Sequence, residues 1–103
     1  MHAIIREKIP EITRIAVRHR VRRLGVFGSA TGDRFNPATS DIDFVVEFKP
    51  MTPVEHARAY FGLAEDLAQV FGREIDLVEL SAVQNPIFRR SVEETRRDIY
   101  AVA

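Results

Sequence analysis

The order of helical and extended patterns narrows the folds open to this chain of 103 residues. An apolar run at 21–27 ends in glycine, and the alternating pattern of 41–48 predicts a second strand. The pattern of 53–71 is helical, and 74–80 predicts a third strand. With helical patterns before and after these segments, the sequence predicts an α/β or α+β fold in which helices cover a small mixed β-sheet.

The helix predicted over 53–71 carries start and stop signals at both ends. Thr52 and Glu55 fit a capping box, Pro53 suits the first helical position, and Gly72 is a natural stop. Its apolar residues recur at helical spacing and are expected to pack against the sheet, both phenylalanines included. They are Val54, Ala57, Phe61, Ala64, Leu67, Ala68 and Phe71.

The remaining segments give shorter signals. Apolar residues at helical spacing near the N-terminus predict a helix in which Pro10 occupies the first position, after a short separate turn. Residues 28–40 predict a loop with one helical turn, and Asn85 with Pro86 predicts the start of a further helix. The tail at 99–102 predicts a short edge strand.

Composition narrows the protein class. The length predicts one domain, 1–103, and the 46% hydrophobic and 29% charged content is that of a folded globule. Fifteen basic and fifteen acidic residues cancel, so no bulk charge draws the chain to nucleic acid or membrane. Cysteine is absent, which excludes disulfides and thiolate zinc sites, and no apolar stretch suits a signal peptide. We therefore expect a cytoplasmic protein.

Three aspartates on the predicted strands carry the strongest chemical signal. Asp41 and Asp43 point to the same side of one strand, and Asp76 joins them if the third strand pairs beside the second. Two carboxylates about 4 Å apart repel by roughly 4 kcal/mol at an effective dielectric constant of 20. Divalent cations remove that repulsion, and these hard oxygen ligands suit two Mg²⁺ or Mn²⁺ ions that act on a phosphate. Taken singly, each aspartate can equally be a turn cap or a solvated edge residue.

A glycine–serine pair follows the first strand. Gly28 allows a ligand to approach the backbone closely, and the Ser29 hydroxyl with the next N–H groups can bind phosphate oxygens. On its own such a pair is more often a plain turn. Together with the three aspartates it indicates metal-dependent nucleotidyl transfer.

These residues resemble the DNA polymerase β-type nucleotidyltransferase signature. The chain reads Gly28-Ser29-Ala30-Thr31-Gly32, then Ser40-Asp41-Ile42-Asp43, then Asp76. Its length is similar to that of the minimal nucleotidyltransferases, the antitoxin partners of HEPN-domain toxins. The resemblance implies a nucleotidyltransferase-like fold and transfer of AMP from ATP to a tyrosine of the HEPN partner, with two Mg²⁺ ions.

The resemblance also implies a role for each site residue. Asp41 and Asp43 would hold both metal ions, Asp76 would bind one and act as base, and Gly28 with Ser29 would hold the triphosphate. One position departs from the family: many members have arginine where this chain has Thr31. An arginine contact to the triphosphate would then have to come from Arg34 instead.

Two alternatives stay open beside the enzyme. The same fold can act as an antitoxin that neutralises its partner by binding, with little catalysis. A small-molecule nucleotidyltransferase is disfavoured, because 81–103 leaves no room for a substrate domain, although a dimer can build a shared site.

The arginines of 14–23 suit a solvated or partner-facing surface better than a nucleic-acid-binding surface. Phe88 and Tyr100 are candidates for the core or for a patch that contacts an oligomer or toxin.

Overall fold

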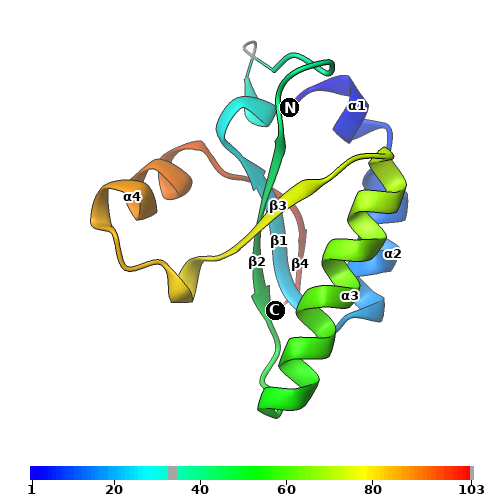
Figure 1. Cartoon of the computed structure of the whole chain (residues 1–103), viewed down its shortest axis with the longest axis vertical. Coiled ribbons are helices and arrows are strands. Elements are labelled where there is room, and N and C mark those ends of the chain that lie inside the picture. The colour runs from blue at the N-terminus through cyan, green and yellow to red at the C-terminus, as the bar shows by residue number, and fades with distance from the viewer. Residues whose placement is uncertain (33–34, 103) are drawn as a thin grey trace.

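A computed structural model describes residues 1–32 and 35–102 (Figure 1). The element order is α1 (Ala3–Arg6), α2 (Ile9–Arg18), β1 (Val21–Phe27), the 3-10 turn η1 (Gly28–Thr31), β2 (Ile42–Phe48), α3 (Pro53–Phe71), β3 (Ile75–Glu79), the 3-10 turn η2 (Leu80–Ala82), α4 (Pro86–Thr95) and β4 (Arg97–Ala101). Arg34, proposed above as a phosphate contact, lies outside the described residues.

The strands of the described chain form one mixed sheet in the order β3-β2-β1-β4, which confirms the predicted architecture. β1 is antiparallel to both of its neighbours, whereas β2 and β3 run parallel and are joined by α3. Gly25 lies where β1 meets β4, and a Cβ atom there would be 2.6 Å from the carbonyl oxygen of Arg97. The close approach of two backbones therefore explains a glycine inside an otherwise apolar strand.

The two faces of the sheet pack against different helices, as Figure 1 shows for α2 and α3 on one side and α4 on the other. Ile42, Phe44 and Val46 of β2 are buried in the core with residues of α1, α2 and α3. Val45 points the other way and packs with Phe27 and Val92. The predicted alternation of β2 is thus confirmed. Each fully buried side chain of this size stabilises the fold by about 1.5–3 kcal/mol relative to an exposed one.

Helix α3 has the predicted ends but a different rotation. Its capping box is formed, with the Thr52 hydroxyl accepting from the N–H of Glu55, and Gly72 ends it in a left-handed conformation at φ 62°. However, Val54 is 61% exposed and Phe61 is 68% exposed, so their prediction as core residues is wrong. The helix carries two apolar stripes at helical spacing. Leu67 is buried as predicted, and Ala59 and Leu63 are buried in place of the two exposed residues.

Polar contacts along α3 hold that rotation. The Tyr60 hydroxyl donates to the carbonyl oxygen of Leu77 at 2.7 Å, which ties the helix to the outer edge of β3. His56 pairs with Glu79 at 2.6 Å at the end of the same strand. Turning the other apolar stripe toward the sheet would break these contacts at a cost in free energy. They therefore favour the stripe that is buried.

Other boundaries differ slightly from expectation. Pro10 is the second rather than the first residue of α2, and the separate turn before it is the short helix α1. β4 begins at Arg97, two residues earlier than the predicted edge strand. None of the helices in the described part of the chain is long and apolar enough to cross a lipid bilayer.

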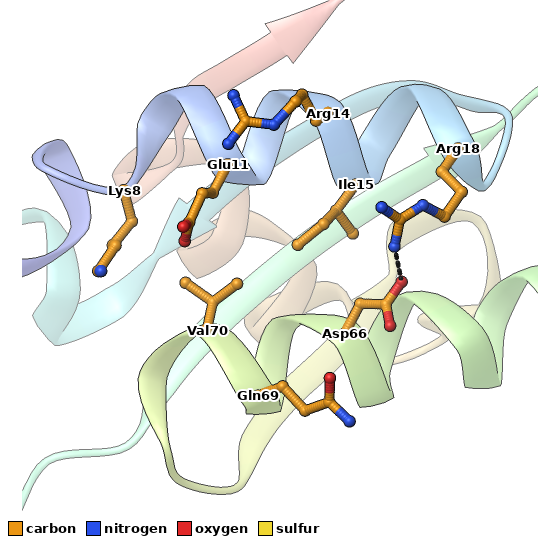
Figure 2. A pocket seen from close by; sticks show the side chains of 8 residues that line it. All are labelled: Lys8, Glu11, Arg14, Ile15, Arg18, Asp66, Gln69 and Val70. Atoms are coloured by element: carbon orange, nitrogen blue, oxygen red, sulfur yellow. Dashed lines mark hydrogen bonds and ion pairs between the residues drawn. The ribbon is translucent and has the colours of Figure 1, made fainter.

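An ionic cluster joins α2 to α3 at the groove shown in Figure 2. Asp66 accepts from Arg18 at 3.0 Å and pairs with His19 at 2.6 Å. The ring of His19 lies against Gly62, where an added Cβ atom would be 2.6 Å from its Cε1 atom. The hydrogen bond to His19, followed by that to Arg18, lowers the pKa of Asp66 below its ordinary value. The ionised carboxylate therefore stabilises the fold.

We predict that Asp66→Asn lowers the free energy of unfolding by about 1 kcal/mol at pH 7. A carboxylate whose pKa is lowered on folding stabilises above its unfolded pKa of about 4, and this contribution is lost as pH falls through the lowered value. Urea unfolding from pH 7 down to pH 3 should therefore show the difference from wild type shrinking below about pH 4. Glu65→Gln, at the exposed neighbouring position, is the matched control. A penalty that is equal at pH 7 and pH 3 would contradict the ionic role.

Candidate active site

The chain turns sharply at Gly28, directly after β1. Gly28 has a φ of 68°, which a residue with a side chain adopts only at a cost. The Thr31 hydroxyl donates to the Gly28 carbonyl oxygen at 2.8 Å, and the Gly32 N–H donates to that of Ser29 at 3.2 Å. Thr31 thus closes the turn internally.

The same glycine lies against the first carboxylate. The register of β1 and β2 pairs Phe27 with Asp43, so the turn begins beside Asp43. A Cβ atom on Gly28 would be 3.1 Å from the Oδ2 atom of Asp43, a separation tighter than ordinary contact. The left-handed conformation strains any other residue here, and the contact means that a side chain would also have to displace the Asp43 carboxylate.

Parallel pairing of β2 and β3 places Asp43 opposite Asp76. Register partners on adjacent strands point to the same face, so the two carboxyl groups meet. Burial, the hydrogen bond to Asp76 and the charges of Asp76 and Asp41 together raise the pKa of Asp43 to about 6. The folded chain thus holds a carboxyl group whose ionisation is unfavourable unless a cation is nearby.

Asp41 lies one residue before β2 and is exposed. It faces a pocket of about 400 Å³ that it shares with Asp76 and two further carboxylates, Glu65 and Glu74. Its charge reaches Asp43, as the raised pKa of Asp43 shows. The structure therefore brings the three predicted aspartates to one end of β2 and β3, with Asp43 and Asp76 in closer association.

A second pocket opens over the Asp43–Asp76 pair. Its volume is about 440 Å³, and aromatic side chains from three elements form its walls: Phe27, Tyr60 and Phe88. Phe27 and Phe88 meet edge to face, with ring centroids 6.0 Å apart. Phe88 is 41% exposed, so it belongs to a pocket wall rather than to a closed core. Sequence periodicity could not identify this wall, because the three rings come from separate elements.

The donor chemistry of the site fits a hard divalent cation. Asp43 and Asp76 supply oxygen ligands, and the raised pKa of Asp43 marks a repulsion that such a cation removes. Among the described residues, however, no three His, Cys, Asp or Glu side chains gather into one ready ligand set. The Asp43–Asp76 pair thus fits a cation, and Asp41 adds its charge from the pocket that it shares with Asp76.

Thr95 is a site residue that sequence reasoning missed. Its hydroxyl oxygen accepts from the N–H of Gly28 at 3.0 Å. The Gly28 amide is therefore already hydrogen-bonded within the protein, and Ser29 is the predicted phosphate-binding residue that remains at the turn. No local pattern pointed to Thr95, because it ends a helix far along the chain from Gly28.

Comparisons with known proteins point to one family. The family model described as "Nucleotidyltransferase domain" matches residues 6–99. Two proteins of Methanocaldococcus jannaschii, each named "Putative protein adenylyltransferase", are 34% and 32% identical to this chain over 77 and 78 residues. Those stretches cover 75% of this chain in both cases, and 74% and 75% of the two relatives.

Solved structures share the fold. One described as a "putative minimal nucleotidyltransferase" has a TM-score of 0.67 at 27% identity and covers 90% of each chain. A chain from a toxin–antitoxin structure with AMP-PNP has a TM-score of 0.65 at 20% identity, covering 91% of this chain and 73% of that one. At that identity the second likeness concerns the fold alone.

We predict that Asp43→Asn stabilises the metal-free protein. Because folding raises the pKa of Asp43 to about 6, ionised Asp43 destabilises the fold above that pH, and the penalty fades as pH falls toward 4. Chemical unfolding with a chelator present should show a gain of about 1 kcal/mol at pH 8, an amount discounted for partial exposure. Glu7→Gln, at an exposed position, serves as control. Lower stability of Asp43→Asn at pH 8 would contradict the geometry.

Proposed function

The chain belongs to the nucleotidyltransferase domain family, and we propose that it transfers AMP from ATP to a hydroxyl group of another protein. The observation that carries this proposal is the Asp43–Asp76 pair beside the turn at Gly28. The names of the two archaeal relatives support the choice of a protein as acceptor.

Each site residue has a role in this reaction. The Ser29 hydroxyl and the N–H groups after Gly28 hold the triphosphate. Asp41, Asp43 and Asp76 would hold Mg²⁺ or Mn²⁺, which would neutralise these carboxylates and polarise the phosphate. Asp76 also accepts the proton of the acceptor hydroxyl. Its exposure on an edge strand leaves it open to an incoming protein.

The reaction needs one proton acceptor, and Asp76 can take that role. The acceptor oxygen attacks the α-phosphorus of ATP, and its proton moves to a carboxylate oxygen of Asp76. The new bond joins the acceptor oxygen to the α-phosphorus of AMP. The bond from the α-phosphorus to the oxygen that bridges it to the β-phosphorus breaks, and pyrophosphate leaves.

Pocket shape supports tyrosine as the acceptor residue. A phenol ring can pack edge to face against Phe27 and Phe88 while its hydroxyl approaches Asp43 and Asp76. Serine or threonine would leave those aromatic walls uncovered. Solved toxin–antitoxin structures of the same fold, the one with AMP-PNP among them, support a toxin as the partner. We propose that this toxin is of the HEPN type and carries the tyrosine, as the sequence resemblance implies.

A second candidate function is neutralisation by binding alone. Exposed apolar side chains favour it, because Ile87 is 80% and Phe61 is 68% exposed. Such residues on two different helices provide contact area that catalysis does not require.

The decisive test pairs the protein with a HEPN-type toxin protein. We expect transfer of label from α-labelled ATP to a tyrosine, detected by mass spectrometry. The double change Asp41→Asn plus Asp43→Asn should slow transfer by about 10²-fold or more, because the triphosphate charge is no longer neutralised.

The matched control is Glu93→Gln plus Glu94→Gln, two exposed acids on α4 whose partners are surface arginines. Unchanged AMP transfer by the double aspartate variant would contradict the enzymatic proposal. Neutralisation of the toxin that survives while transfer is lost would support the binding function instead.

A further inference from the structure

The last residue of α4 joins that helix to the turn after β1. The Thr95 hydroxyl accepts from the Gly28 N–H at 3.0 Å and donates to the Ser91 carbonyl oxygen at 2.8 Å. Both functions of the hydroxyl are therefore used, and the bond to Ser91 orients its free lone pairs. A side chain held in this way can fix the position of the amide group that donates to it.

The amide of Gly28 is one of the groups that a nucleotide site would be expected to use. The first N–H groups of a helical turn have no acceptor inside the turn, so each needs an outside partner. Thr95 is that partner for Gly28. The Gly28 backbone also lies against Asp43. A Cβ atom added to Gly28 would be 3.1 Å from the Oδ2 atom of Asp43. Rotation of this peptide would change the turn and the space around Asp43 together.

Helix α4 is anchored well enough to hold the turn in place. Val92 is fully buried against Phe27 and Val45 on the α4 side of the sheet. At the other end of the helix, Arg89 donates to the carbonyl oxygen of Leu80 at 2.8 Å. Thr95 therefore extends from a helix that is attached to the sheet and to the chain after β3.

We propose that Thr95 is a positioning residue for the nucleotide-binding turn, an inference that rests on the function proposed above. By occupying the amide of Gly28, it holds the turn at one setting relative to Asp43 and leaves the amide and hydroxyl of Ser29 for the triphosphate. The residue acts through Gly28 and does not touch the nucleotide. Since Phe88 of the same helix forms a wall of the acceptor pocket, α4 also sets that wall relative to the turn.

The test measures the binding of AMP-PNP with Mg²⁺ to the whole chain by calorimetry. Thr95→Val keeps the shape of the side chain but removes the hydroxyl. We expect it to raise the dissociation constant about tenfold, whereas Thr95→Ser should stay within about twofold of wild type. Thr13→Val, the same change on α2, is the matched control and should bind like wild type. Thr95→Ala provides a second variant if the valine variant does not fold.

Two further readouts separate positioning from simple loss of stability. In the transfer assay, Thr95→Val should raise the KM for ATP more than it lowers kcat. Amide hydrogen exchange followed by NMR should find the Gly28 N–H protected in wild type and Thr95→Ser, and exposed in Thr95→Val. Thermal unfolding of each variant checks that all binding is measured on folded protein.

Three results would overturn the positioning role of Thr95. Affinity of Thr95→Val equal to wild type would overturn the inference, and tighter binding would do so as well, because it would mean that phosphate uses the freed Gly28 amide. Failure of Thr95→Ser to restore binding would also overturn it. If wild type itself binds no AMP-PNP while its Gly28 amide is protected, then the proposed function fails, and the positioning role falls with it.

Discussion

Parallel pairing of β2 with β3 is the interaction on which the site depends. It sets Asp43 opposite Asp76, and a slip of one residue would turn one of the carboxylates to the other face of the sheet. Register is held by the buried residues of β2 on one face and by Val45 on the other. Hydrophobic burial thus forces together two like charges that would otherwise separate.

The cost of that arrangement is visible in the electrostatics. Asp43 is partly buried beside two other aspartates, which raises its pKa to about 6. A site with no use for a cation gains nothing from such repulsion. The close approach of Gly28 adds a second constraint, because any side chain there would meet Asp43. Both features are explained if the site binds a metal–nucleotide complex in which positive charge reaches the carboxylates.

Much of the fold could be predicted from sequence because its signals are local. Alternation along β2, the capping box of α3 and the asparagine–proline start of α4 each depend on residues close in the chain. The rotation of α3 could not be predicted, since two apolar stripes compete and contacts from Tyr60 and His56 to β3 favour one of them. Sequence periodicity therefore places Phe61 in the core, whereas the structure exposes it.

The candidate site divides in the same way. The three aspartates and the glycine–serine turn stand out in the sequence, because their residue types and spacing are unusual. The aromatic pocket walls and Thr95 do not, because they are brought to the site by tertiary packing of α3 and α4. Spacing also predicts a single cluster of three carboxylates. In the described residues Asp41 shares one pocket with Asp76, while Asp43 and Asp76 line another.

The most direct measurement is anomalous diffraction from crystals grown with Mn²⁺ and AMP-PNP, which locates the metal independently of the protein density. The account predicts Mn²⁺ between the carboxylates of Asp43 and Asp76, with the triphosphate against Ser29. Manganese bound elsewhere, or Asp43 and Asp76 turned away from a bound nucleotide, would contradict it.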